Sequence, residues 1–303
     1  MPEAPIAIIS GWDGELGRGH IQRMVSLLDH LVHSAGMPAV LIAERAPDFL
    51  PENLRRYVKP APGERVALFV RDMRDSTVEE IGRLRKRAPV LCIDDLGPGR
   101  GLADHALDLL PNPGRPESAP DGGLFLHGYQ FRASLAALGN AAIPKRLDCT
   151  IYAGAQPREE DVKRLLSIVP KGSSCAVFRG HGSFLQEGTS KRAIGQDDYA
   201  RLLLSSRLFL SHFGIALYEA GAASCIPVAL NPTEYHSRLC GIAPKELGIV
   251  NLGTHDSFDS TASAAVVTRL IKENPAGEAS APDILASVRE NLDRFTSLLR
   301  TMI

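Results

Sequence analysis

The chain has 303 residues, of which 44% are hydrophobic and 23% charged, and it carries 34 Lys and Arg against 35 Asp and Glu. This length and balance favour a globular protein of two domains and exclude a disordered chain. Neither sign of charge gathers in a long run, so we expect no nucleic-acid partner. No apolar stretch is long enough to cross a bilayer and the first residues lack a cationic signal segment, so we expect a cytoplasmic protein that does not span a membrane.

Short apolar runs alternate with helical patterns along the chain. This alternation is typical of parallel strands joined by crossover helices that cover both faces of a sheet. Ile21, Met24, Leu28 and Leu31 recur at helical spacing, so the helix after the first strand is predicted to bury one stripe of its surface. The strands predicted in the first half are residues 6–10, 39–43, 66–70, 90–93 and 106–110.

Residues 111–123 are rich in Pro, Gly and Ser and have no usable period, which predicts a surface loop. After Pro144 the alternation begins again, and a final helix is predicted over residues 281–301. We therefore expect an α/β protein with two Rossmann-like domains, residues 1–143 and 144–303. The strands predicted in the second half are residues 149–152, 175–179, 207–211, 226–230 and 249–252.

The five cysteines are widely spaced, lie mostly in apolar runs and form no C-x-x-C pair, so they are predicted to be core thiols. The nine histidines are scattered as well. A structural zinc site needs clustered thiolate and imidazole ligands. The sequence therefore predicts no metal site.

The first candidate site follows the first predicted strand, in residues 11–20. Glycines such as Gly17 and Gly19 allow the backbone to approach a ligand closely, and the helix that follows presents backbone amides to an anion. His20 stands at the start of this helix, and Arg23 follows one turn later on nearly the same face. The positive end of a helix disfavours a protonated imidazole, so His20 is predicted to act as a neutral base.

An alternative is that these glycines only turn the chain and that His20 caps the helix. The loop also departs from the register of the G-x-G-x-x-G dinucleotide fingerprint. No acidic residue ends the second strand as that fingerprint requires, although Glu44 is close. We therefore expect no nicotinamide cofactor.

The second candidate site is the turn from the strand at 207–211 into the next helix. The backbone amides near Gly214, Ile215 and Ala216 are predicted to hold a diphosphate. Glu219, one turn into the helix, has a carboxylate suited to accept two hydrogen bonds from ribose hydroxyls. The alternative for a lone helical Glu is a solvated surface position.

Acidic residues end two strands of the first half. Asp94 and Asp95 follow the strand at 90–93, and Asp72 follows the strand at 66–70. Side chains at this edge of a parallel sheet are placed to orient a sugar or His20, or else they only cap the next helix. In the second half Arg179 precedes residues 180–182, which either approach the uracil or phosphates or form a plain turn.

The order of these motifs resembles that of a known enzyme family. The pattern runs from G-x-G-H-x-x-R at residues 17–23, through Asp94 and Asp95, to Gly214 and Glu219, with Val70 to Asp72 and Gly128, Tyr129 and Arg132 between them. It is similar to the UDP-sugar hydrolases of pseudaminic acid biosynthesis and the related spore-coat polysaccharide proteins, which have the GT-B glycosyltransferase fold. The second half more distantly resembles the lipid-linked peptidoglycan glycosyltransferase that adds N-acetylglucosamine.

The resemblance implies a GT-B protein in which two Rossmann-like domains with parallel sheets face a central cleft. It implies that His20 lies near the anomeric carbon and activates water, that UDP departs with inversion, and that neither a metal nor another cofactor takes part. Arg23 or Arg179 would assist as a cation, and Asp94 would act beside His20. The substrate-binding residues expected on this basis are Gly17, Gly19, Asp72, Tyr129, Gly154, Arg179, Phe213, Gly214, Ile215, Ala216, Glu219, Tyr235 and His236.

The sequence departs from that family in two places. Residues 231–236 read Asn-Pro-Thr-Glu-Tyr-His where the family carries an Asn-Gln pair, and Arg18 replaces a hydrophobic residue. Our first hypothesis is a hydrolase that cleaves a UDP-linked, N-acetylated deoxysugar at its anomeric carbon, in surface glycan biosynthesis. A glycosyltransferase that uses a UDP-sugar donor and a nucleotide-sugar-binding protein without catalysis are the alternatives.

Overall fold

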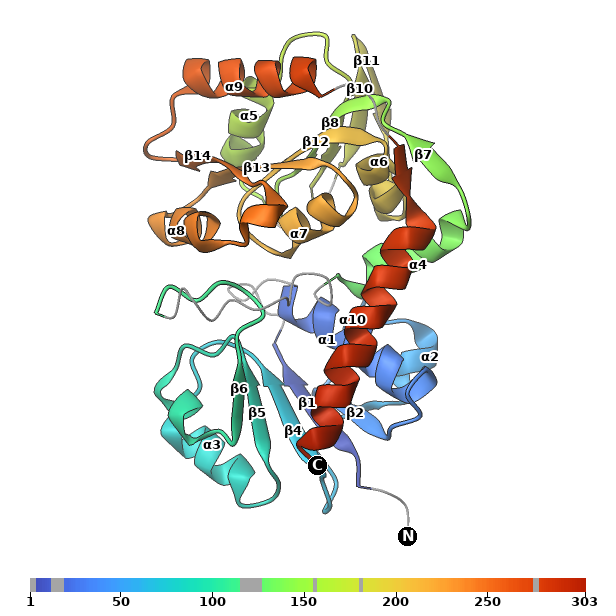
Figure 1. The fold of residues 1–303 in the computed structure, drawn as a ribbon, viewed down its shortest axis with the longest axis vertical. Coiled ribbons are helices and arrows are strands. Elements are labelled where there is room, and N and C mark those ends of the chain that lie inside the picture. Colours follow the sequence, from blue (N-terminus) through green and yellow to red (C-terminus); the bar gives the residue numbers. More distant parts are fainter. Residues whose placement is uncertain (1–3, 12–18, 115–126, 155–156, 180–181, 275–277) are drawn as a thin grey trace. The chain divides into compact units, whose positions relative to one another are not determined.

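The computed structural model describes residues 4–11, 19–114, 127–154, 157–179, 182–274 and 278–303. These form two compact units, which Figure 1 shows in the colours of the sequence. Unit 1 holds the described residues up to Asn112 together with 127–129 and Val288–Ile303, and unit 2 holds Pro113, Gly114 and the described residues of Gln130–Ser287. The sequence predicts a single domain boundary, at 143/144. In the structure the last residues of the chain, Val288–Ile303, belong to unit 1.

The core of unit 1 is a sheet of six strands in the order β3-β2-β1-β4-β5-β6, in which every pairing is parallel. This is the strand order of a Rossmann fold. The strands are β1 (Ile6–Ser10), β2 (Ala39–Ile42), β3 (Val58–Lys59), β4 (Leu68–Asp72), β5 (Val90–Ile93) and β6 (His105–Leu107). The helices are α1 (Gly19–His33), α2 (Glu52–Arg55) and α3 (Val78–Arg85), with a 3-10 turn η1 (Pro98–Leu102).

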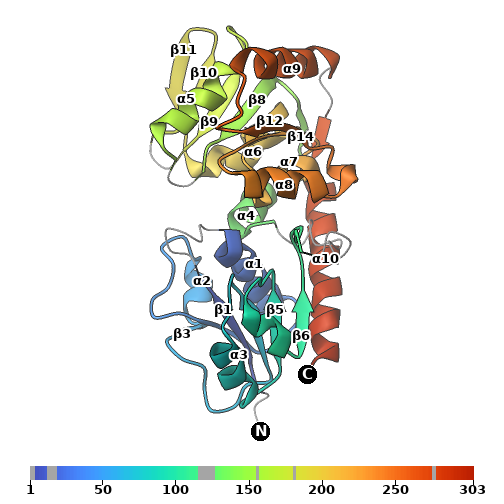
Figure 2. The ribbon, with the colours of Figure 1, turned by 90° about the vertical axis from the view of Figure 1, so that its left-hand side faces the viewer.

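Helix α1 buries the stripe that the sequence predicts, because Ile21, Met24, Leu28 and Leu31 are all fully buried. Helix α3 packs through Ile81 and Leu84 on the sheet face that carries Ala7, Phe69 and Cys92. Figure 2 shows α1 and α3 beside the strands of this sheet.

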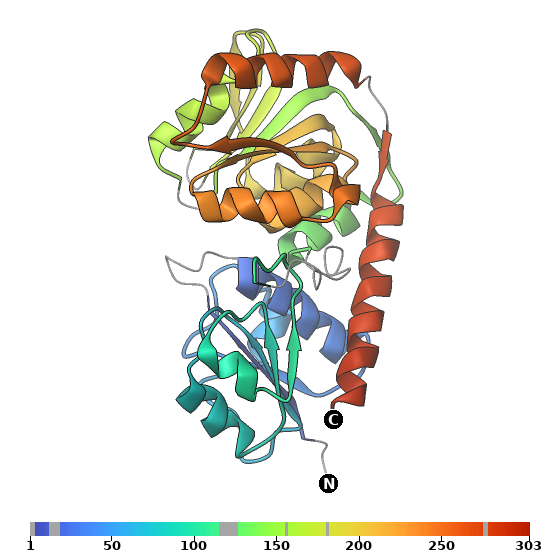
Figure 3. The same ribbon diagram turned by 60° about the vertical axis from the view of Figure 1, so that its left-hand side comes forward.

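Unit 2 is built on a sheet of seven strands in the order β11-β10-β9-β8-β12-β13-β14. Helices α5 and α9 pack on one face, through Val162, Leu165 and Val267, against strand residues such as Ile151 and Leu210. Figure 3 shows α8 on the other side of this sheet from α9. The strands are β8 (Leu147–Tyr152), β9 (Cys175–Phe178), β10 (Phe184–Glu187), β11 (Ser190–Ala193), β12 (Ser206–Ser211), β13 (Ile226–Asn231) and β14 (Val250–Thr254), and a separate antiparallel pair joins β7 (Ala142–Pro144) to β15 (Glu278–Ser280). The helices are α4 (Tyr129–Leu138), α5 (Glu159–Ser167), α6 (Tyr199–Leu204), α7 (Ile215–Ala222), α8 (Glu234–Ile242), α9 (Ser260–Glu273) and α10 (Ala281–Thr301), with 3-10 turns η3 (Gln196–Asp198) and η4 (Lys245–Leu247).

One edge of unit 2 departs from the parallel strands that the sequence predicts. Strands β10 and β11 form an antiparallel hairpin, and β10 pairs antiparallel with β9. Every residue of β11 is exposed, so this edge strand lacks the apolar run that identifies a buried strand.

Three predicted strands of unit 1 end at other residues than expected. Strand β2 ends one residue early, at Ile42. Strand β4 continues through Arg71 and Asp72, because ion pairs compensate the burial of both charges. Strand β6 ends at Leu107 instead of 110, because the amides of Leu109 and Leu110 donate to the Asp94 carboxylate instead of to a strand.

The final helix, α10, has the bounds that the sequence predicts. Its first residues belong to unit 2, and Val288 and the residues after it belong to unit 1. Among the described helices, none has the length and apolarity required to cross a membrane.

Candidate functional site

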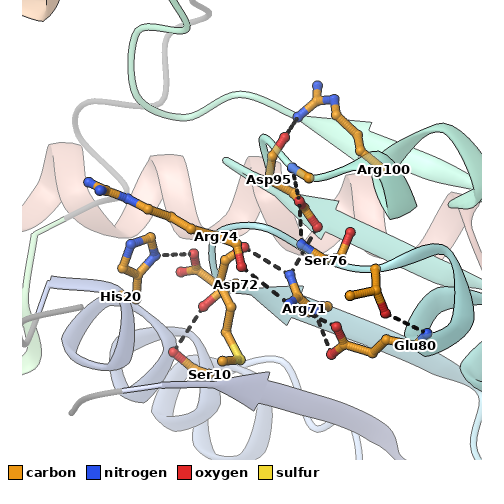
Figure 4. A network of polar contacts seen from close by, with 12 residues as sticks. Ser10, His20, Arg71, Asp72, Arg74, Ser76, Glu80, Asp95 and Arg100 are labelled. Carbon is orange, nitrogen blue, oxygen red and sulfur yellow. Dashed lines mark hydrogen bonds and ion pairs between the residues drawn. The ribbon is translucent and has the colours of Figure 1, made fainter. Parts of the chain in front are cut away.

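In unit 1 the imidazole of His20 is held by the carboxylate of Asp72. His20 is the second residue of α1 and is 7% exposed, and its Nδ1 lies 2.7 Å from Oδ1 of Asp72, the last residue of β4. Figure 4 shows this pair, with the hydroxyl of Ser10 donating to the backbone oxygen of Asp72 at 3.2 Å. Within the described residues, Nε2 of His20 has no hydrogen-bond partner. A carboxylate on Nδ1–H leaves the lone pair on Nε2, which makes Nε2 the basic atom.

Arg23 lies one turn after His20 and is fully buried. Its Nε and Nη2 donate to the two carboxylate oxygens of Asp72, and Nη2 is 3.3 Å from Nδ1 of His20. Its remaining nitrogen, Nη1, forms an ion pair of 2.6 Å with Oδ2 of Asp94. The guanidinium therefore bridges the carboxylates at the ends of two neighbouring strands.

Asp94 follows β5 with a φ of 50°, a left-handed conformation that Asp tolerates better than most residues. Its Oδ1 accepts hydrogen bonds from the amides of Leu109 at 2.6 Å and Leu110 at 2.9 Å. Burial raises the pKa of Asp94, and the attraction to Arg23 offsets this only in part. Burial also raises the pKa of Asp72, but Arg23 and His20 outweigh it and leave that pKa below its ordinary value.

A second polar network lies beside this cluster and belongs to the scaffold. Arg71 donates from Nη1 to Asp95 at 2.9 Å and from Nε to Glu80 of α3 at 2.9 Å. Asp95 also accepts from the amide of Ser76 at 3.0 Å (Figure 4). It accepts from the amide of Gly97 as well, at 2.8 Å. Of the two predicted acidic residues at the end of β5, the structure thus places Asp94 in the His20 cluster and Asp95 in the scaffold.

In unit 2 the second predicted site is the turn between β12 and α7. The amide of Phe213 donates to the Asn231 side chain at 2.9 Å, which fixes the end of β12 against the end of β13. Gly214 precedes the first residue of α7, and Gly214, Ile215 and Ala216 are all partly exposed. This turn presents the first amides of a helix, a position suited to a phosphate group.

Glu219 lies inside α7 and is only 6% exposed, so its interpretation as a solvated surface residue is wrong. Its Oε2 accepts a hydrogen bond of 2.9 Å from the phenol of Tyr199. Burial and the Glu219 carboxylate raise the pKa of Tyr199 well above its ordinary value. The carboxylate is therefore held in one orientation by α6.

Three histidines gather at the carboxyl ends of the unit 2 strands. The ring of His212, directly after β12, packs edge-on against that of His236, with centroids 6.2 Å apart. His255 follows β14, and its Nδ1 lies 3.2 Å from Asp161 and 3.4 Å from Nη1 of Arg164. Burial and the two other histidines lower the pKa of His212 to about 4.

The sequence reasoning predicted only His236 of this group. Sequence gives no sign that His255 and Asp161 pair, because they come from distant parts of the chain. The place of His212 directly after a predicted strand was the one available signal. Gly154 belongs to the same edge, since a Cβ at its position would lie 3.5 Å from Cε1 of His212.

The remaining predicted residues have contacts of their own. Arg179 forms an ion pair of 2.8 Å with Glu159 and donates to the backbone of Gly182. Tyr129 begins α4, and Tyr235 contacts the His236 ring from inside α8. Gly17 and residues 180 and 181 lie outside the described residues. The described part of the chain holds no group of three His, Cys, Asp or Glu side chains arranged for a metal ion.

Comparisons by sequence find no relative, since no family model and no curated protein matches the chain. Comparisons by structure do find similar proteins. A proposed UDP-N-acetylglucosamine 2-epimerase from Listeria monocytogenes is 10% identical with a TM-score of 0.52, over 94% of this chain and 91% of that one. S. aureus MnaA in complex with UDP is 10% identical with a TM-score of 0.51, over 95% and 91%.

Arabidopsis thaliana UGT89C1 in complex with UDP-L-rhamnose is also similar, at 12% identity and a TM-score of 0.50, over 97% of this chain and 95% of that one. At identities this low, a structural similarity is evidence for the fold alone. These similarities, together with the two Rossmann-like units, show that the chain has the GT-B fold.

Proposed function

We propose that the chain is a hydrolase of UDP-linked sugars, with His20 as the base that activates water. The observation that carries this proposal is the buried His20–Asp72 pair at the carboxyl end of β4, with Nε2 of His20 left for a ligand. Ligands of Rossmann-like sheets bind at this edge. The UDP and UDP-L-rhamnose named for two similar structures support a UDP-sugar as the substrate class.

In the proposed reaction, Nε2 of His20 takes a proton from water while the water oxygen forms a bond to the anomeric carbon. The bond from that carbon to the diphosphate oxygen breaks, and UDP departs with the electron pair. Asp72 holds the ring and stabilises the imidazolium that forms. The amides at Gly214 to Ala216 are proposed to stabilise the departing diphosphate without a metal ion, and Glu219 to bind the ribose.

The sugar is proposed to be N-acetylated and deoxygenated, in line with the family that the sequence resembles. The test is phosphorus NMR of the protein with a panel of UDP-N-acetyl sugars in water, followed by hydrolysis in ¹⁸O-labelled water. We expect UDP without label and a free sugar with label on the anomeric oxygen. Label in the UDP would place the bond cleavage at phosphorus and contradict the proposed step.

Replacing His20 by Ala should lower kcat by about 10²- to 10⁴-fold, the usual contribution of a general base. His33→Ala is the matched control, since His33 ends the same helix, is partly exposed and pairs with the partly exposed Asp29. Turnover is expected to persist in EDTA. Full activity in His20→Ala would exclude His20 as the base.

A glycosyltransferase is the second candidate, because the same base can deprotonate an acceptor hydroxyl instead of water. The exposed hydrophobic residues of unit 1 favour it: Val78, Leu96 and Leu102 are 53%, 44% and 37% exposed near the start of α3 and along η1. Exposed apolar surface of this kind suits a lipid-linked acceptor. If UDP is released only when an acceptor lipid is added, and not in water alone, the chain is a glycosyltransferase.

UDP binding without turnover of any UDP-sugar would instead support the third hypothesis, a binding protein without catalysis. In that case His20→Ala should leave UDP affinity unchanged.

A further inference from the structure

The second carboxylate of the His20 cluster has no role in the reaction as written above. We propose that Asp94 is a positioning residue that acts through Arg23 and supplies the negative charge that lets His20 hold a proton. This inference deepens the proposed function and rests on it for its catalytic meaning. The arrangement of charges in the cluster can be tested without any substrate.

Arg23 opposes the protonation of His20. Its guanidinium occupies both oxygens of Asp72, including Oδ1, the oxygen that His20 contacts. Its Nη2 is also 3.3 Å from Nδ1 of His20. The single negative charge of Asp72 is therefore shared between the Arg23 guanidinium and the imidazole. One carboxylate cannot neutralise both the guanidinium and a protonated imidazole.

Asp94 restores the balance of charge. With neutral His20 the buried cluster carries two carboxylates and one guanidinium, a net charge of −1. When His20 takes a proton, two cations face two carboxylates and the net charge is zero. Without the charge of Asp94 the protonated cluster would carry +1 in a region where burial leaves little water to screen it.

Burial and the neighbouring Asp72 raise the pKa of Asp94, whereas the direct contacts of Asp94 favour its ionised form. Oδ2 pairs with Nη1 of Arg23 at 2.6 Å, and Oδ1 accepts two amide hydrogens. Each of these partners is a donor, and a protonated carboxyl would oppose one of them. The backbone conformation of Asp94 and the amides of Leu109 and Leu110 hold the carboxylate in this position.

Few other charged groups face His20 among the described residues. On α1 it faces Arg23, and on β4 it faces Asp72. Arg74 follows β4 and is exposed, and Figure 4 shows its side chain on the same side of Asp72 as the His20 ring. Asp95 and Arg71 pair with each other in the scaffold network, so Asp95 is a matched control for its neighbour Asp94.

The test is an NMR titration of the His20 ring in the full chain, with assignment from the signal lost in His20→Gln. We expect Asp94→Asn to move the midpoint of the His20 titration to lower pH by about one unit, as for removal of a charge beyond direct contact. Asp95→Asn should leave the midpoint within about 0.3 units, although it also breaks a buried network. A folded Asp94→Asn variant with an unmoved midpoint would overturn the proposal.

Asp94→Asn leaves a buried guanidinium partly unpaired, and this variant alone could fail to fold. Two further variants test the proposal in that case. Arg23→Met removes the cation, and the double variant with Asp94→Asn removes both charges of the ion pair. In the Arg23→Met background, Asp94→Asn should move the midpoint by less than about 0.3 units, because without its guanidinium partner the buried Asp94 carboxyl no longer carries the charge that reaches His20. A shift of a full unit in this background would contradict the route through Arg23, and it can be measured even if Asp94→Asn alone is unfolded.

Hydrolysis of UDP-sugars is measured separately on the same variants. With Asp94→Asn we expect a lower kcat, an unchanged KM and an acid limb of the pH–rate profile that moves with the NMR midpoint. If no variant, including the unmodified chain, hydrolyses a UDP-sugar while the midpoints shift as expected, the proposed function fails and the charge coupling stands. If His20→Ala abolishes hydrolysis but Asp94→Asn leaves the midpoint unchanged, only the present inference fails.

Discussion

His20 and Asp72 lie 52 residues apart in the sequence, yet Nδ1 of the one and Oδ1 of the other are 2.7 Å apart in the core of unit 1. Helix α1 and strand β4 each contribute one partner. Arg23 donates to both oxygens of this carboxylate, so protein groups alone hold it in place.

The first prediction concerns Asp72→Asn. The amide keeps the shape of the side chain but removes the charge that stabilises a protonated His20, so kcat should fall by about 10³-fold. Stability should fall by about 3 kcal/mol, because a buried guanidinium loses its main partner. Urea unfolding and UDP release measure the two effects. Asp29→Asn is the control, since Asp29 is partly exposed and pairs with the partly exposed His33. Wild-type turnover in Asp72→Asn would contradict the role of the pair.

The second prediction concerns the hydrogen bond from Tyr199 to Glu219. Tyr199→Phe leaves a buried carboxylate with one donor fewer, which should lower the free energy of unfolding by about 1–2 kcal/mol. Tyr57→Phe is the control, because the Tyr57 hydroxyl accepts a hydrogen bond from the exposed Arg56 side chain. The effect of this substitution should stay within about 0.5 kcal/mol. Equal unfolding midpoints in urea for the two variants would show that the bond to Glu219 contributes nothing.

The third prediction concerns pH. The pKa of His212 is lowered to about 4 in the folded chain from 6.5. Between these values the unfolded chain binds a proton that the folded chain does not, so stability is present above pH 6.5 and is lost as the pH falls toward 4. For His212 alone the loss amounts to about 3 kcal/mol. His212→Asn should flatten this part of the stability curve, measured by urea unfolding at pH 4.5 and 7; an unchanged difference between the two pH values would contradict the assignment.

The fourth prediction compares two glycines of unit 1. A Cβ at Gly97 would lie 2.3 Å from the backbone of Ser76, within the turn that Asp95 holds. Gly97→Ala should therefore destabilise the chain by more than about 2 kcal/mol, since the backbone must move. Gly82 lies inside α3 with open space at its Cβ position, so Gly82→Ala should stabilise by about 0.5–1 kcal/mol. Thermal unfolding of both variants measures the contrast, and similar melting temperatures would contradict it.

Much of the fold could be predicted because parallel strands buried on both faces are short apolar runs. β1 and β5 have the predicted bounds, and so does α10. Edge elements such as β3 and β11 were not predicted, because a strand that packs on few neighbours carries no apolar signal. The expected placement of the two domains about a central cleft remains a prediction.

The sequence by itself determined that two Rossmann-like units carry a histidine, an arginine and acidic residues near strand and helix ends, because these motifs are local and follow apolar runs. Only the tertiary structure decided which acidic residues face His20. Neighbours in the pairs Arg71–Asp72 and Asp94–Asp95 belong to different networks, one at His20 and one in the scaffold. Adjacent strand residues such as Arg71 and Asp72 point to opposite faces of the sheet. Asp94 and Asp95 follow β5, and the left-handed backbone at Asp94 precedes the change from one network to the other. Where each strand ends and how it pairs are set by contacts distant in the sequence.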